Sequence, residues 1–183
     1  WVLHNRLGNT YYRFLLFSFL FTLGNSSDAF LILKGQGAGL TLWQIFLLLA
    51  GYSLVSSISG LPLSNLSDRI GRKKLLVAGW LLYAFVYILF AQSTSVWMIV
   101  GLFLLYGVYY GCTEGVAKAL VSDVVDKEHQ GTAYGVYNMV VGLTLLPASV
   151  IAGFLWQTVG PAAAFSFGAG TAFIAALGLM FFL

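Results

Sequence analysis

Charged residues are scarce in this chain. Asp, Glu, Lys and Arg make up only 8% of its 183 residues, whereas 60% are hydrophobic and the mean hydropathy is +0.89. A soluble domain carries roughly 25% charged residues, because its surface faces water. The shortage of charge excludes a water-soluble globular domain and predicts an integral membrane protein.

Residues that form disulfides or ligate metals are also few. The single cysteine, Cys112, cannot form an internal disulfide, and no His or Cys spacing typical of a metal site occurs. We therefore expect no metal and no cofactor. The net charge of +3 does not indicate nucleic acid as a partner, because in a membrane chain the placement of basic residues matters more than their sum.

Signals of catalysis and of an ion pore are lacking too. Both histidines, His4 and His129, fall outside the apolar segments, and no serine-protease-like nucleophile motif occurs beyond the weak match "SISG". A channel needs a filter-like loop or rings of charge, and the one glycine-rich loop, residues 34–41, is short and carries Lys34. We expect neither an enzyme nor a channel.

Long apolar segments divide the chain into six predicted membrane spans. A bilayer core of about 30 Å requires about 20 apolar residues in a helix. Gly, Pro or charged residues stand at the breaks, where they interrupt helices. The sequence thus predicts an all-α, multi-pass bundle over residues 1–183, with spans at residues 12–33, 42–63, 75–91, 96–120, 133–158 and 162–183.

The basic residues predict the orientation of these spans. Lys34 is the only one of nine Lys and Arg residues on one predicted side of the membrane. Lys and Arg in short loops stay in the cytoplasm. Both termini are therefore predicted to be cytoplasmic, in a protein of the cytoplasmic (inner) membrane.

The segment "NLSDRIGRKK", residues 65–74, holds five of the fifteen charged residues. It resembles the signature loop of the major facilitator superfamily, Gly-x-Leu-Ala-Asp-Arg-x-Gly-Arg-Lys/Arg, which lies between the second and third helices of each six-helix half. Ser67 stands in the small-residue place, and Ser64 replaces the opening glycine. The matching residues are Leu66, Asp68, Arg69, Gly71, Arg72 and Lys73.

A second segment, "ALVSDVVDKEHQGTAYGVYN" at residues 119–138, resembles the loop between the fourth and fifth helices of such a half. Asp123 and Gly131 match that pattern, whereas Gln130 stands where arginine is usual. The salt bridge of that arginine is therefore expected to be absent.

The resemblance implies one half of a twelve-helix major facilitator fold, and the opening residues favour the C-terminal half. Its implied partners are the other six-helix half, a small-molecule substrate, protons and membrane lipids. The signature loop is expected to act as a cytoplasmic gate, with Asp68 accepting hydrogen bonds from a helix N-terminus of the other half. Arg69 and Arg72 would bind nearby acids, Asp123 or Glu114. The alternative, that the charges only anchor the topology, is preferred for Lys73 and Lys74.

An ionisable residue inside a span indicates a functional site, because burying its charge costs several kcal/mol. Asp28 follows Gly24, Asn25 and two serines. These four residues favour a helix poorly, so the first span is expected to break or bend there. Asp28 and Asn25 are candidates for binding a proton or a cationic substrate. Alternatively, Asp28 caps a helix after the break or lies near the outer interface.

The fourth predicted span carries several further candidates. Glu114 and Lys118 are spaced i, i+4 and can pair; a structural ion pair is preferred over a role in transport. The spacing of Gly107, Gly111 and Gly115 predicts close helix packing. Residues that could line a cavity are Tyr106, Tyr110 and Asn138, with Tyr109 and Tyr137 as further possibilities.

The function expected from the resemblance is secondary active transport of a small solute by alternating access, with proton-coupled efflux first. A proton symporter or a facilitative uniporter of the same fold is the alternative. A non-transporting membrane receptor or scaffold is the alternative of another class, because a fold does not determine a function.

Overall fold

The computed structural model describes residues 2–183, with side chains from Leu7 onward. These residues form helices and no strand. The helices are α1 (Val2–Gly24), α2 (Ala29–Gly37), α3 (Leu42–Ile70), α4 (Arg72–Gln92), α5 (Val96–Val124), η1 (Lys127–His129, a 3-10 turn), α6 (Gln130–Thr158) and α7 (Pro161–Phe182).

The prediction of six membrane spans is confirmed. Six segments among the described residues are long and apolar enough to cross a bilayer, and each overlaps one predicted span. The first of them, Leu7–Gly37, consists of α1 and α2 together, with the expected break between them at residues 25–28. Several helices extend beyond the predicted limits; α3, for example, continues to Ile70 rather than ending at residue 63.

The description of residues 65–74 as a loop is wrong. Nearly all of this segment is helical, and only Gly71 separates α3 from α4. Gly71 has a φ of 99°, a backbone conformation that residues with a Cβ rarely adopt, so one glycine makes the whole turn. The charged side chains of the segment are consequently fixed to the ends of two long helices.

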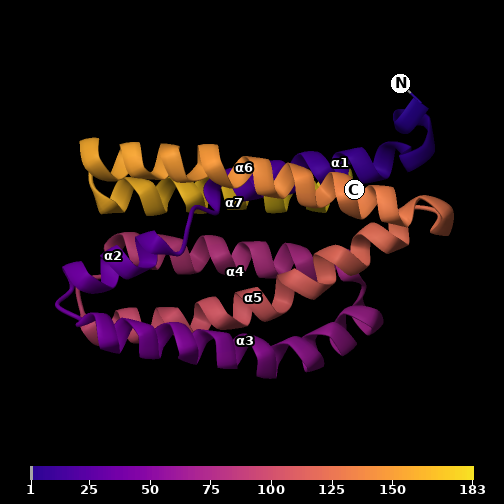
Figure 1. The fold of residues 1–183 in the computed structure, drawn as a ribbon. Helices are drawn as coiled ribbons and strands as arrows, with labels where there is room; N and C mark the ends of the chain where they lie inside the picture. Colours follow the sequence, from indigo (N-terminus) through magenta and orange to yellow (C-terminus); the bar gives the residue numbers. More distant parts are fainter. Residues whose placement is uncertain (1) are drawn as a thin grey trace.

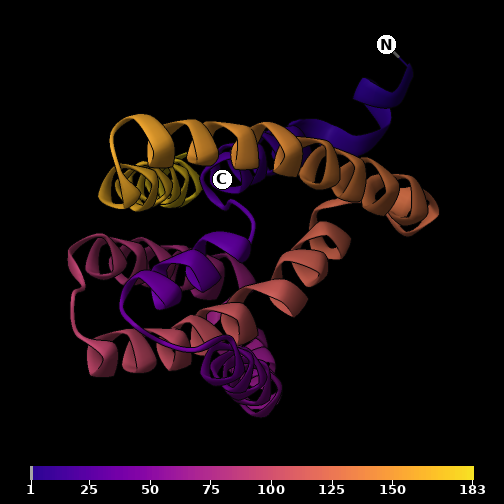
Figure 2. The ribbon, with the colours of Figure 1, turned by 60° about the vertical axis from the view of Figure 1, so that its left-hand side comes forward.

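Two groups of helices make up the bundle (Figures 1 and 2). One group contains α1, α6 and α7, and the other contains α3, α4 and α5. The break after α1 carries the chain from the first group to the second, where α2 contacts α3. Helix α4 packs against both α5 and α7 and so joins the two groups.

The contact between α1 and α7, within the first group, is close because small residues let the backbones approach. A Cβ at Gly168 of α7 would lie 2.6 Å from the carbonyl oxygen of Gly24, at the end of α1. Aromatic rings fill the space around this contact: Tyr87 packs edge-on against Phe165 at 5.2 Å. The break in the first span is therefore held against α7 and α4.

Large apolar side chains remain exposed on α3 and α6. Leu61 of α3 is 77% exposed, and Leu146 of α6 is 71% exposed. Such faces suit contact with lipid or with other membrane-spanning helices, as expected for a membrane protein.

Both chain ends lie at the same end of the bundle, together with the α3–α4 turn and the α5–α6 connection (Figure 1). The α2–α3, α4–α5 and α6–α7 connections lie at the other end, where Lys34 is located near the end of α2. This arrangement matches the predicted grouping of basic residues; the cytoplasmic assignment of that end stays a prediction.

Candidate functional site

The break between α1 and α2 exposes backbone groups inside the first span. Helix α1 ends at Gly24, whose carbonyl oxygen has no partner within the helix and accepts a hydrogen bond of 3.0 Å from the Tyr83 hydroxyl of α4. Asn25 donates a hydrogen bond of 3.3 Å to the Tyr109 hydroxyl of α5. Side chains of the second helix group thus satisfy the broken end of α1.

Asp28 occupies the N-cap position of α2 but makes no side-chain capping bond. Its carboxylate instead accepts two hydrogen bonds from tyrosines. The Tyr106 hydroxyl donates to Oδ1 at 3.0 Å, and the Tyr52 hydroxyl donates to Oδ2 at 3.1 Å. Within the described residues no Lys or Arg pairs with Asp28. The acid is therefore held by neutral donors from α3 and α5.

The partners of Asp28 are placed differently from the prediction. Tyr106 was expected to line a cavity, but it is 1% exposed and faces Asp28 instead. Its ring lies 5.5 Å from that of Tyr52 and 5.3 Å from that of Tyr109. The sequence signal for Tyr52 was weak, because nothing in its own helix marks a tyrosine as the partner of an acid in another span.

A cavity of about 270 Å³ lies beside this tyrosine group, between α1, α4, α5 and α6. Tyr110 and Asn138 line it, and Asn25, Glu114 and Lys118 lie in its wall as well. The other lining residues are Ser18, Phe21, Thr22, Trp80, Tyr109, Thr113, Ala117, Tyr137 and Val141. The cavity thus combines charge, amide groups and aromatic surface.

Glu114 and Lys118 form the expected i, i+4 pair. The distance from Lys118 Nζ to Glu114 Oε1 is 3.5 Å, and the side chains are 59% (Glu114) and 52% (Lys118) exposed. Neither side chain makes an ion pair with the signature segment among the described residues. The pair therefore belongs to the cavity wall rather than to the α3–α4 turn.

The three glycines of α5 have unequal surroundings. A Cβ at Gly107 would lie 2.5 Å from the Tyr52 carbonyl oxygen, and one at Gly111 would lie 2.9 Å from the Ser56 carbonyl oxygen. These two glycines face the backbone of α3. A Cβ at Gly115 would meet nothing within 4 Å, and Gly115 borders a hollow of about 310 Å³ between α3 and α5. Close packing at Gly115 is therefore not found.

Arg72, at the start of α4, links the ends of three helices. Its Nη1 donates to Asp123 Oδ1 at 2.7 Å and to the Ala119 carbonyl oxygen at 2.6 Å, both on α5. Its Nη2 lies 3.4 Å from Asp68 Oδ1 on α3. Of the two acids expected to bind Arg72, Asp123 does so and Glu114 does not.

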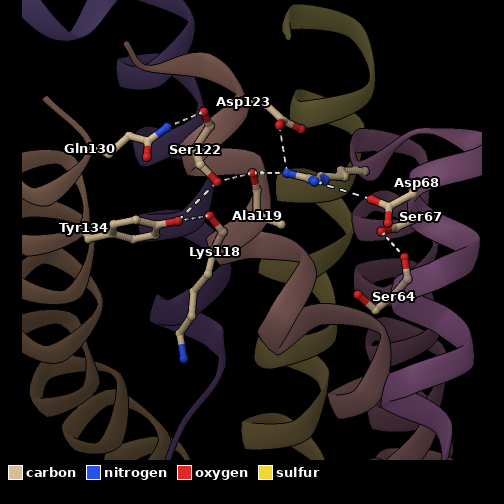
Figure 3. Close-up of polar contacts among 10 residues, drawn as sticks. Ser64, Ser67, Asp68, Lys118, Ala119, Ser122, Asp123, Gln130 and Tyr134 are labelled. Carbon is tan, nitrogen blue, oxygen red and sulfur yellow. Dashed lines mark hydrogen bonds and ion pairs between the residues drawn. The ribbon is translucent and has the colours of Figure 1, made fainter. Parts of the chain in front are cut away.

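The connection between α5 and α6 is held by uncharged groups (Figure 3). Gln130 Nε2 donates to the Ser122 carbonyl oxygen at 3.0 Å. The Tyr134 hydroxyl lies 3.1 Å from the Lys118 carbonyl oxygen and 3.2 Å from Ser122 Oγ. Gln130 thus fastens this connection by an amide hydrogen bond, at the position where the resembling motif has an arginine.

The other charged residues of the signature segment are less engaged. Within the part of the chain that the structure describes, Arg69, Lys73 and Lys74 form no ion pair. No group of three His, Cys, Asp or Glu side chains among those described, from Leu7 onward, is placed to share a metal ion. The charged contacts of this end therefore centre on Arg72.

Six apolar spans with an acid and a polar cavity between them define a multi-pass integral membrane protein. Residues 12–183 match the Major Facilitator Superfamily. The chain belongs to this superfamily of transporters. The resemblance inferred from the signature segment is confirmed.

Three relatives illustrate the match. An uncharacterised MFS-type transporter of Methanocaldococcus jannaschii is 37% identical over 174 residues, which cover 92% of this chain and 44% of that protein. The inner membrane transport protein YajR of Escherichia coli is 31% identical over 60% of this chain and 24% of its own length. The class E tetracycline resistance protein of Escherichia coli is 32% identical over 71% of this chain and 32% of its own length. The chain spans less than half the length of these relatives.

Proposed function

We propose that the chain is one six-helix half, the C-terminal half, of a secondary active transporter in the cytoplasmic membrane. The transporter moves a small solute by alternating access, in which one half rocks against the other around a site near the midplane. Proton-coupled export is the proposed direction and coupling. The family, the coverage of less than half of each relative and a relative named for tetracycline resistance support this proposal.

The observation that carries the proton coupling is the environment of Asp28. A carboxylate inside a span is costly unless it serves transport or is paired. Asp28 has two hydroxyl donors, Tyr52 and Tyr106, and no cation beside it among the described residues. Hydroxyl groups can both donate to an ionised carboxylate and accept from a protonated one. Asp28 is therefore suited to gain and lose a proton in place.

The tyrosines connect this acid with the cavity. Tyr106 binds Asp28 and packs on Tyr109, and Tyr109 accepts a hydrogen bond from Asn25 in the cavity wall. Protonation of Asp28 removes the negative charge that organises the hydroxyls and so changes the contacts at the break in the first span. A solute in the cavity meets the same break through Asn25. Proton and solute thereby act on the same break in the first span.

Arg72 supplies the proposed gate at the other end of the helices. Its contacts with Asp68, Asp123 and Ala119 hold α3, α4 and α5 together at the α3–α4 turn. Asp68 is 61% exposed and keeps acceptor capacity for backbone N–H groups of the other half. The turn at Gly71 positions the side chains of Asp68 and Arg72. Arg69 and Lys73 add positive charge at the same α3–α4 turn.

The test uses the full-length transporter in everted membrane vesicles. Vesicle pH is followed with a fluorescent dye while cationic, neutral and anionic compounds are added. At least one compound is expected to dissipate the proton gradient in the wild type and not in Asp28→Asn. Asp126→Asn is the matched control, because Asp126 lies in the α5–α6 connection and outside the helices.

The outcomes separate the alternatives. Equal dissipation by the wild type and Asp28→Asn would remove Asp28 from the coupling path. If no compound dissipates the gradient, antiport is wrong, and uptake of labelled solutes distinguishes symport and uniport from a receptor or scaffold that moves nothing.

A further inference from the structure

The wall of the cavity carries one negative and one positive side chain on the same helix face. Glu114 and Lys118 both line it, and their charged atoms are 3.5 Å apart. The cavity is therefore close to neutral overall although it is strongly dipolar. A solute with one net charge would neutralise one of the two side chains and leave the other facing it with like charge.

The pair is easily opened by a competing ligand. Both side chains are more than half exposed, and ion pairs of this kind contribute little to stability because water screens them. A solute that carries both an ammonium and a carboxylate group can replace both halves of the pair at once. Glu114 then binds the ammonium group, Lys118 binds the carboxylate, and no charge is left without a partner.

The remaining wall indicates the body of such a solute. Phe21 and Trp80 lie in the wall stacked on each other at 4.7 Å, and the partly buried rings of Tyr110 and Tyr137 give the cavity further aromatic surface. Asn25 and Asn138 add amide groups. Ser18, which also lies in the wall, has a buried hydroxyl with no hydrogen-bond partner in the described residues. Such an unsatisfied hydroxyl indicates a missing polar partner.

We propose that this cavity binds a zwitterionic solute with an aromatic ring, whose ammonium group pairs with Glu114 and whose carboxylate pairs with Lys118. The inference rests on the proposed transport function, and it names the substrate class of the same protein. The volume of about 270 Å³ suits a solute of the size of an aromatic amino acid.

The test measures equilibrium binding to the purified full-length protein in detergent by isothermal titration. Three probes share one ring: L-phenylalanine carries both charges, phenethylamine lacks the carboxylate and 3-phenylpropionate lacks the ammonium group. The wild type is expected to bind phenylalanine about tenfold more tightly than either single-charge probe, the size of one favourable charge contact at a partly exposed site.

Two variants must change the ranking in opposite directions. Glu114→Gln is expected to remove the preference of phenylalanine over 3-phenylpropionate, and Lys118→Gln the preference over phenethylamine. A general loss of folding cannot produce this reciprocal result. Glu128→Gln, in the α5–α6 connection, is the matched control and should leave all three affinities unchanged.

The inference is overturned if none of the three probes binds, if the wild type binds all three equally, or if both variants weaken all three alike. Its failure is distinct from that of the proposed function, because titration in detergent involves no proton gradient. If the variants change the order of the probe affinities as expected but no proton movement occurs in vesicles, the proposed proton coupling is wrong and the proposed substrate class stands. If protons move in vesicles but the affinities do not follow this order, the substrate class is wrong and the coupling stands.

Discussion

The chain holds its acids in two different ways. Asp28, in the first span, is bound by the neutral hydroxyls of Tyr52 and Tyr106. Asp68 and Asp123, at the α3–α4 end of the bundle, share the guanidinium group of Arg72. The first acid lies at a break in a helix, whereas the other two lie near the ends of continuous helices.

Under the proposed coupling, this difference separates the acid that changes its charge from the two that do not. Asp68 and Asp123 each form an ion pair with Arg72. Asp28 has no ion pair among the described residues, and its hydroxyl partners can either donate or accept a hydrogen bond. We therefore assign a fixed electrostatic link to the Arg72 cluster and a reversible one to Asp28.

The largest effect is expected when both hydroxyls beside Asp28 are removed. Because each hydrogen bond to a charged group contributes about 1.5–3 kcal/mol, removing both with Tyr52→Phe/Tyr106→Phe should lower the initial transport rate at least about a hundredfold. Of the two single variants, Tyr106→Phe should slow transport more than Tyr52→Phe, since Tyr106 is 1% exposed and Tyr52 is only half-buried. Rates of proton-linked transport in everted vesicles of the full-length protein measure both.

Tyr134→Phe is the control for this comparison. It also removes a tyrosine hydroxyl bound to the chain, but the acceptor is the Lys118 carbonyl oxygen, further along α5. If Tyr134→Phe slows transport as much as the double variant, the hydroxyls of Asp28 have no special role.

A smaller effect is expected from the glycines that place α3 against α5. Gly107→Ala puts a methyl group 2.5 Å from the Tyr52 carbonyl oxygen, so α3 must move and Tyr52 moves with it. Overpacking of this kind costs about 1–3 kcal/mol. Thermal unfolding of the full-length protein in detergent should show the loss, and transport should fall together with it.

Gly115→Ala provides the matched comparison on the same helix. Its Cβ would meet nothing within 4 Å, and alanine favours a helix over glycine by about 1 kcal/mol. Its stability should therefore stay the same or rise slightly. Equal destabilisation by Gly107→Ala and Gly115→Ala would contradict the account of α3–α5 packing.

Much of the fold can be predicted from local properties of the sequence. Hydropathy predicts the six spans because each must fill a bilayer with apolar residues. The break after Gly24 is predictable because glycine and serine are poor helix formers. The structure of residues 65–74 is mispredicted, because their charges are typical of a loop although Gly71 alone makes the turn between two helices.

The partners within the site are less predictable, because they come from other helices. Asp28 stands out in the sequence as an acid among apolar residues, but Tyr52 and Tyr106 are two of ten tyrosines. Which of them meets Asp28 depends on the approach of α3 to α5 at Gly107. The pair of Glu114 and Lys118 was predictable because its spacing lies within one helix.

The smallest effect is expected at the fixed acids. Arg72→Gln removes two ion pairs and the bond to the Ala119 carbonyl oxygen, but these groups are partly exposed, so the expected loss of stability is about 1 kcal/mol. Arg69→Gln is the control, since Arg69 is exposed and forms no ion pair among the described residues. Thermal unfolding in detergent compares the two variants.

Salt then separates the two kinds of acid site. At 1 M salt, charges are screened within about 3 Å, so the difference between Arg72→Gln and the wild type should shrink. The slowing of transport by Tyr52→Phe/Tyr106→Phe should persist, because neutral hydroxyl donors inside a span are not screened in this way. If salt instead removes the tyrosine effect and leaves that of Arg72→Gln unchanged, the assignment of the reversible and the fixed link is wrong.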